Sequence, residues 1–180
     1  MIIDERNSRR ERIINVANAM MTAARTAPKG KGFDIIEIKL VTDEDIKTLS
    51  KAMLEYSEKT GMMFVTRDAE NILLSDAIVL IGTKQKIHNL NCTYCGFSTC
   101  EEKMKYSEVP CSLNSVDVGI AIGSACAIAA DARVDTRVMF SAGRVAQELG
   151  WMPECSNVYG IPLSCSSKNP FFDRQSTRPK

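Results

Sequence analysis

The run AIVLIG at residues 77–82 constrains the fold more than any other segment of this chain. It is apolar without interruption, with Asp76 before it and Gly82 at its end. A strand with one exposed face alternates apolar and polar residues, whereas a continuous apolar run of this length is typical of a strand buried on both faces. The sequence therefore predicts a sheet that carries helices.

Amphipathic patterns predict the helices that cover this strand. Residues 8–27 place apolar side chains on one stripe, and Ser8 and Glu11 have the spacing of a capping box. Further helices are predicted at 42–60, 67–75, 115–132 and 136–149. Two more strands are predicted at 34–41 and 157–164, and the last ten residues, FFDRQSTRPK, predict an arm.

The predicted helix at 115–132 is about long enough to approach a bilayer span. Asp117 lies inside it, and its bulk is Ala, Gly and Ser rather than Leu or Phe, so we expect a buried helix instead. Gly119, Gly123 and Ala127 recur at every fourth residue. Small residues at this spacing let a second backbone approach closely, which favours a homodimer.

Charge and histidine content exclude several classes of function. Lys and Arg number 23 against 22 Asp and Glu, a net charge of +1, so no bulk field favours nucleic acid or an anionic membrane. His88 is the single histidine, which excludes sites that need two or three imidazoles. The start MIIDERNSRRER has no apolar signal region, so we expect a cytoplasmic protein without disulfides.

Four of the seven cysteines lie close together in a polar connection. Cys92, Cys95, Cys100 and Cys111 follow the spacing C-x2-C-x4-C-x10-C. Soft thiolates at such spacing suit an iron–sulfur cluster or zinc. Zinc sites usually pair two short knuckles and only one is present here, which favours iron–sulfur, while zinc and unliganded thiols stay open as alternatives.

The cysteine segment also carries a family resemblance. LNCTYCGFSTCEEK, followed by PCSLNSVDVGIAIGSACAIAADARVDTRVMFSAG, resembles the prokaryotic ferredoxin-domain proteins of unknown function over nearly the whole chain. The resemblance implies a 4Fe-4S cluster on Cys92, Cys95, Cys100 and Cys111.

A weaker resemblance concerns the scaffold. AARTAPKGKGFDIIEIKLVTDEDIKTL and the late NVYGIPLSCSSKNP are similar to segments of FMN nitroreductases. This implies a nitroreductase-like α+β fold, a single domain over 1–180 with a central sheet flanked by helices. The metal-binding segment would be an inserted loop at 88–111, called the cysteine loop below.

The nitroreductase resemblance also implies candidate FMN ligands. Arg9 and Arg10 resemble the basic pair that holds the FMN phosphate, and Lys29 lies in the turn APKGKG. That turn departs from the nitroreductase pattern, because it contains two lysines and lacks the usual Asn-Gln-Pro. Two other interpretations stay open: solvated arginines in the first turn of a helix, and lysines at the C-terminal end of its dipole.

The remaining candidates have plainer interpretations. His88 is expected to be an exposed loop residue, and Cys126 a core residue. Cys155 and Cys165 flank the last strand and are interpreted as structural thiols, with a redox pair as the alternative.

Three functions follow from these observations: the two given below, and a flavin-dependent reductase whose cysteines are incidental. The first is an iron–sulfur redox protein, in which a 4Fe-4S cluster exchanges electrons with a donor or acceptor protein and with a flavin as second centre. The alternative is a metal-stabilised binding or structural module without catalysis, in which zinc or an inert cluster holds the cysteine loop.

Overall fold

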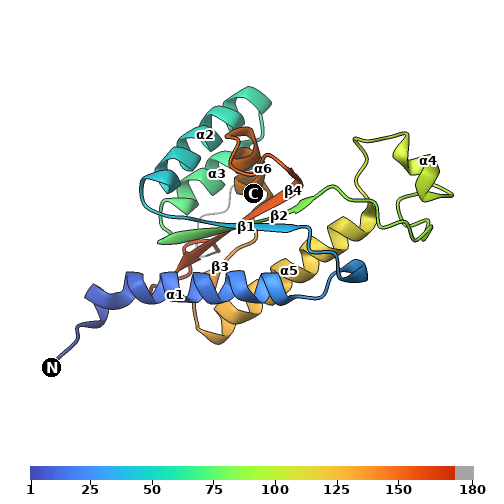
Figure 1. Cartoon of the computed structure of the whole chain (residues 1–180). Helices are drawn as coiled ribbons and strands as arrows, with labels where there is room; N and C mark the ends of the chain where they lie inside the picture. The colour runs from blue at the N-terminus through green and yellow to red at the C-terminus, as the bar shows by residue number, and fades with distance from the viewer. Residues whose placement is uncertain (173–180) are drawn as a thin grey trace.

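The computed structural model describes residues 1–172 and is built on a four-stranded antiparallel sheet in the order β1-β2-β4-β3 (Figure 1). The strands are β1 (Ile36–Val41), β2 (Ala77–Lys84), β3 (Asp135–Thr136) and β4 (Cys155–Ser164). β2 and β4 form the central pair, with Leu80 opposite Gly160. All of β2 except Lys84 is buried, which confirms the prediction that this strand is covered on both faces.

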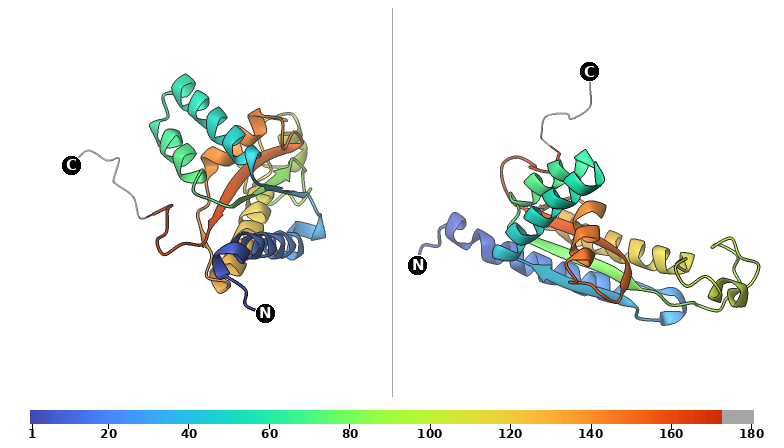
Figure 2. Two further views of the ribbon diagram at one scale, coloured as in Figure 1. Left: turned by 90° about the vertical axis from the view of Figure 1, so that its left-hand side faces the viewer. Right: turned by 90° about the horizontal axis from the view of Figure 1, so that it is seen from above.

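One face of the sheet is covered by the two longest helices, α1 (Glu5–Thr26) and α5 (Ser112–Asp131) (Figures 1 and 2). Their small side chains allow close packing: Ala17 and Ala24 of α1 and Ala121 and Ala125 of α5 are fully buried in one core cluster. The apolar stripe predicted for the first helix is therefore its core face.

The other face is covered by α2 (Glu44–Thr60), α3 (Met63–Ile72) and α6 (Phe140–Glu148) (Figure 2). These helices and the sheet enclose a second core cluster that includes Leu49, Ile72 and Leu80. Phe171 is also fully buried in this cluster, so the prediction of an arm is wrong for this residue. The rest of that arm, 173–180, lies outside the described residues.

Several predicted helix starts are corrected. Asp4 caps α1 by accepting a 2.8 Å hydrogen bond from the amide of Arg6, so the capping box predicted at Ser8 and Glu11 is wrong. Ser8 lies inside the helix instead, where its hydroxyl donates to the carbonyl of Asp4. The helix predicted at 67–75 starts earlier and is α3, while the segment predicted at 136–149 begins as β3 and becomes helical only in α6.

α5 is the single described helix that is long and apolar enough to cross a membrane. It lies along α1 and the sheet, and Ala121, Ala125 and Ala129 on its inner face are completely buried. The prediction of a buried helix is therefore confirmed for one face of α5 only. Its other face exposes Val116 and Ile120 on either side of Gly119.

The cysteine loop extends beyond one end of the sheet (Figures 1 and 2). It leaves β2, contains the short helix α4 (Cys100–Met104) and returns to the start of α5. The turn η1 (Gly30–Gly32), between α1 and β1, lies at the same end of the molecule (Figure 1). The loop and the turn therefore meet outside both core clusters.

Candidate metal centre in the cysteine loop

The four cysteines of the loop line a single cavity. Its wall contains Cys92, Cys95, Cys100 and Cys111, together with His88 and Lys103. The cavity volume is about 10 Å³, space for about one water molecule. Cysteines up to 19 residues apart in the sequence thus line one small cavity.

Left-handed backbone conformations coil the first half of the loop. Asn89, Asn91, Thr93 and Gly96 all have positive φ angles, 53°, 46°, 63° and 87°. Asn and Gly adopt this region most readily, which explains why they stand at three of the four positions. The repeated reversals bring Cys92 and Cys95 to the same cavity.

Asn91 joins this coiled segment to α4. Its side-chain Oδ1 accepts the amide N–H of Cys100 at 2.8 Å, and its own amide N–H donates to the sulfur of Cys100 at 3.3 Å. Thr99 caps α4 by accepting the amide of Glu102 at 3.1 Å, which presents Cys100 at the first helical position. Local hydrogen bonds therefore hold the third cysteine beside the first two.

Cys111 is held differently, because it is buried and occupies the position just before α5. Its sulfur lies 3.8 Å from Nδ1 of His88, and Nε2 of His88 lies 3.4 Å from Oδ2 of Asp117. The other oxygen of Asp117 accepts the amide N–H of Gly30 in η1 at 2.9 Å. A buried line of side chains thus runs from the fourth cysteine to the glycine turn.

The expectation that His88 is exposed is wrong, since only 1% of its surface is accessible. Phe33 packs beside its ring, with centroids 5.7 Å apart, and Lys31 Nζ donates to its carbonyl oxygen at 3.2 Å. Both partners belong to the segment around η1, far from His88 in the sequence. The covering of this histidine is therefore a tertiary effect that its loop position does not reveal.

The four thiols share a cavity without converging on one point. Within residues 1–172, no three His, Cys, Asp or Glu side chains form a group that could hold a metal ion, so no assembled metal cluster is seen. The donor set nevertheless suits a soft metal, because four thiols line the wall and a backbone N–H points at one sulfur. The residues fit a four-thiolate group in their chemistry, and binding would draw the sulfurs together.

The structure separates the candidate FMN ligands. Arg9 and Arg10 lie near the start of α1, where they pair with Glu5 and Asp43 at 2.7 and 2.6 Å. Lys29 follows the other end of this helix, roughly 30 Å away at 1.5 Å per residue. One chain therefore does not bring these three side chains together.

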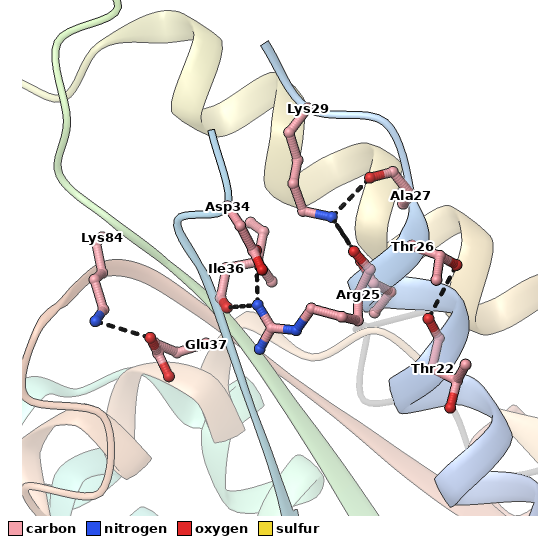
Figure 3. A network of polar contacts seen from close by, with 10 residues as sticks. Thr22, Arg25, Thr26, Ala27, Lys29, Asp34, Ile36, Glu37 and Lys84 are labelled. Carbon is pink, nitrogen blue, oxygen red and sulfur yellow. Dashed lines mark hydrogen bonds and ion pairs between the residues drawn. The ribbon is translucent and has the colours of Figure 1, made fainter. Parts of the chain in front are cut away.

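Lys29 has a structural role in the turn. Its ammonium donates to the carbonyl oxygens of Ala27 at 2.7 Å and Ala24 at 3.2 Å at the end of α1, as Figure 3 shows in part. Partial burial lowers the pKa of Lys29. Arg25 lies beside it and donates to Asp34 and to the carbonyl of Ile36, which fixes the start of β1 (Figure 3). These contacts match the helix-dipole interpretation of Lys29.

The three other cysteines occupy separate places in the scaffold. Cys155 is buried in the core cluster of α2, α3 and α6, whereas Cys126 and Cys165 pack against the cluster of α1 and α5. Cys155 and Cys165 stand at the two ends of β4, about 33 Å apart for an extended strand of this length. They cannot form a redox pair within one chain, and the interpretation as structural thiols stands.

Residues 107–174 match the family described as uncharacterized protein containing a ferredoxin domain (DUF2148). An uncharacterized protein of Archaeoglobus fulgidus is 38% identical over 182 residues, covering 97% of this chain and 98% of the relative. The chain belongs to this ferredoxin-domain family. Of the four loop cysteines, Cys111 lies within the matched residues.

Solved structures show the fold of this family member. The Lactococcus lactis nitroreductase CinD in complex with nicotinic acid has a TM-score of 0.59 at 12% identity, covering 99% of this chain and 86% of that one. A Bacteroides fragilis nitroreductase with bound FMN also has a TM-score of 0.59, at 11% identity, with coverage of 91% and 83%. A BluB-like flavoprotein from Clostridium difficile has a TM-score of 0.56 at 17% identity, with coverage of 92% and 85%. The fold is therefore nitroreductase-like, with its sheet flanked by helices.

Proposed function

We propose that this protein is an electron-transfer protein whose cysteine loop holds a 4Fe-4S cluster on Cys92, Cys95, Cys100 and Cys111. The observation that carries the proposal is the shared cavity: the four thiols line one wall although they come from three separate parts of the loop. Membership of a family described by a ferredoxin domain supports a redox role. A bound cluster would supply a centre that accepts and returns single electrons.

The residues of the loop would have distinct roles in holding the proposed cluster. Cys111 would be the fixed ligand, since it is buried at the start of α5 and lies against His88. The amide of Asn91 would remain a donor to the sulfur of Cys100, and hydrogen bonds of this kind tune a cluster's potential. Redox partners would be one-electron donor or acceptor proteins of the cytoplasm.

Flavin is a second candidate cofactor, favoured by the similar Bacteroides fragilis fold, which contains bound FMN. Arg9, Arg10 and Lys29 would have to act from two different chains, because one helix separates them. Such a site requires the homodimer, and the exposed face of α5 around Gly119 and Gly123 is where we place its interface. Replacing Arg9 and Arg10 together with alanine should weaken FMN binding, and unchanged FMN affinity would remove both residues from the proposal.

The experiment for the cluster is metal and sulfide analysis of protein purified without oxygen. We expect broad visible absorption with about four irons and four sulfides per chain, lost when Cys92 is replaced by serine. Cys126→Ser is the matched control, because this thiol is half-buried beside the core far from the cavity and should leave the iron content unchanged. Colourless protein with about one zinc per chain would instead establish the structural module.

A further inference from the structure

Lys103 is a buried lysine in the wall of the cysteine cavity. Only 2% of its surface is accessible, although the other lysine beside α4, Lys105, is exposed. Lysine is among the residues least often found fully buried, unless its charge is paired. Lys103 lies on α4, one turn after Cys100. α4 belongs to the cysteine loop, which extends beyond the sheet (Figure 1).

The described part of the chain offers this ammonium no carboxylate. No salt bridge within 4.0 Å joins Lys103 to any acidic group of residues 1–172. The acidic neighbours Glu101 and Glu102 are exposed, and the cavity wall contains no Asp or Glu. Lys103 lines the same cavity as the four cysteines, and a cation in a wall without carboxylates favours an anion in that cavity. The four cysteines are the groups of this wall that become anionic when they bind a metal.

We propose that Lys103 is the buried counter-ion of the thiolate ligands and that its charge raises the reduction potential of the site. The inference rests on the proposed function, since it needs an iron–sulfur cluster on the four thiols. One electron delivered by an external reductant adds one negative charge to the site, and the reductant is oxidised by one electron. A fixed positive charge beside the cavity stabilises the reduced state more than the oxidised state.

The test compares three variants of the full chain, purified without oxygen and titrated with dithionite and redox mediators. Lys103→Met removes the charge at similar length, and Lys103→Arg keeps it. Lys105→Met removes an exposed lysine two residues away and is the matched control. Midpoint potential, iron content and circular dichroism are measured on each variant.

We expect a more negative midpoint potential for Lys103→Met, and potentials near that of the unmodified protein for Lys103→Arg and Lys105→Met. If Lys103→Met loses iron while its circular dichroism is retained and Lys103→Arg keeps its iron, the requirement for charge is also supported. An iron-loaded Lys103→Met protein with an unmoved potential overturns this inference and leaves the proposed function intact. Equal loss of iron from both Lys103 variants overturns it as well, because packing rather than charge would explain the residue. An unmodified protein without iron overturns the proposed function and this inference together.

Discussion

Replacing His88 with leucine should destabilise the protein by about 2 kcal/mol. Nε2 of His88 lies 3.4 Å from Oδ2 of Asp117, and both side chains are buried. Neither atom has a hydrogen-bond partner within residues 1–172, so the polar contact between them is the one that the substitution removes. Leaving a buried polar group without a polar neighbour costs about 1–3 kcal/mol, and the expected loss lies in the middle of this range. Leucine is close to histidine in volume, so the cavity contribution is small.

The assay is urea unfolding of the protein under reducing, anaerobic conditions, followed by circular dichroism. Domains of this size are stable by about 5–15 kcal/mol, so the variant stays folded and the loss can be measured. Asp117→Asn removes the charge but keeps an oxygen to accept the amide of Gly30. In the double variant the losses should not add, with a coupling of about 1–2 kcal/mol.

Asn71 provides the control for this comparison of single and double variants. It is a buried polar residue on α3, on the other side of the sheet, and its side-chain nitrogen also lacks a partner. Asn71→Leu combined with Asp117→Asn should be additive within about 0.5 kcal/mol. The reasoning is refuted if His88→Leu changes stability by less than about 0.5 kcal/mol, or if its loss adds fully to that of Asp117→Asn.

Three further predictions concern the scaffold. Burial raises the pKa of Cys155 to about 11, so only about one thiol in a thousand is ionised at pH 8; mass spectrometry after iodoacetamide treatment should find it unmodified in the folded chain. In Gly143→Ala the new Cβ would lie 2.1 Å from the carbonyl oxygen of Val158, so urea unfolding should show a loss of about 3 kcal/mol or more. A Cβ on Gly123 has no neighbour within 4 Å, so Gly123→Leu should leave the circular dichroism unchanged, while light scattering should show loss of the homodimer proposed above.

The layered fold was predictable because the apolar patterns are local. The unbroken apolar run of β2 and the apolar stripe of α1 each indicate which faces of the element are buried. The structure buries those faces. The start of α1 was predicted too late because both Asp4 and Ser8 are residue types that can cap a helix. Asp4 satisfies the helix amides one turn before Ser8, which leaves Ser8 with a role inside the helix.

The candidate site was predictable only in part. Cysteine spacing identified the thiols, since metal ligands cluster in sequence, and the structure places all four on one cavity. The burial of His88 and Lys103 depends on tertiary packing, so the spacing of residues within the loop could not predict it. Asp117 was noticeable in the sequence as a charged residue within an apolar helix. Its contacts with His88 in the loop and Gly30 in η1 explain its presence in this helix.

The two halves of the loop differ in how firmly they are held, and this sets the direction of any rearrangement on metal binding. Cys111 is buried, directly precedes α5 and lies against His88, whose ring packs beside Phe33. Cys92 and Cys100, by contrast, are partly exposed and are linked through Asn91 within the loop itself. Moving Cys111 would disturb the buried line to Gly30, whereas moving the other thiols disturbs only contacts of the loop. In the proposed cluster-bound form, the exposed thiols therefore close onto Cys111, and the nitroreductase-like scaffold keeps its shape.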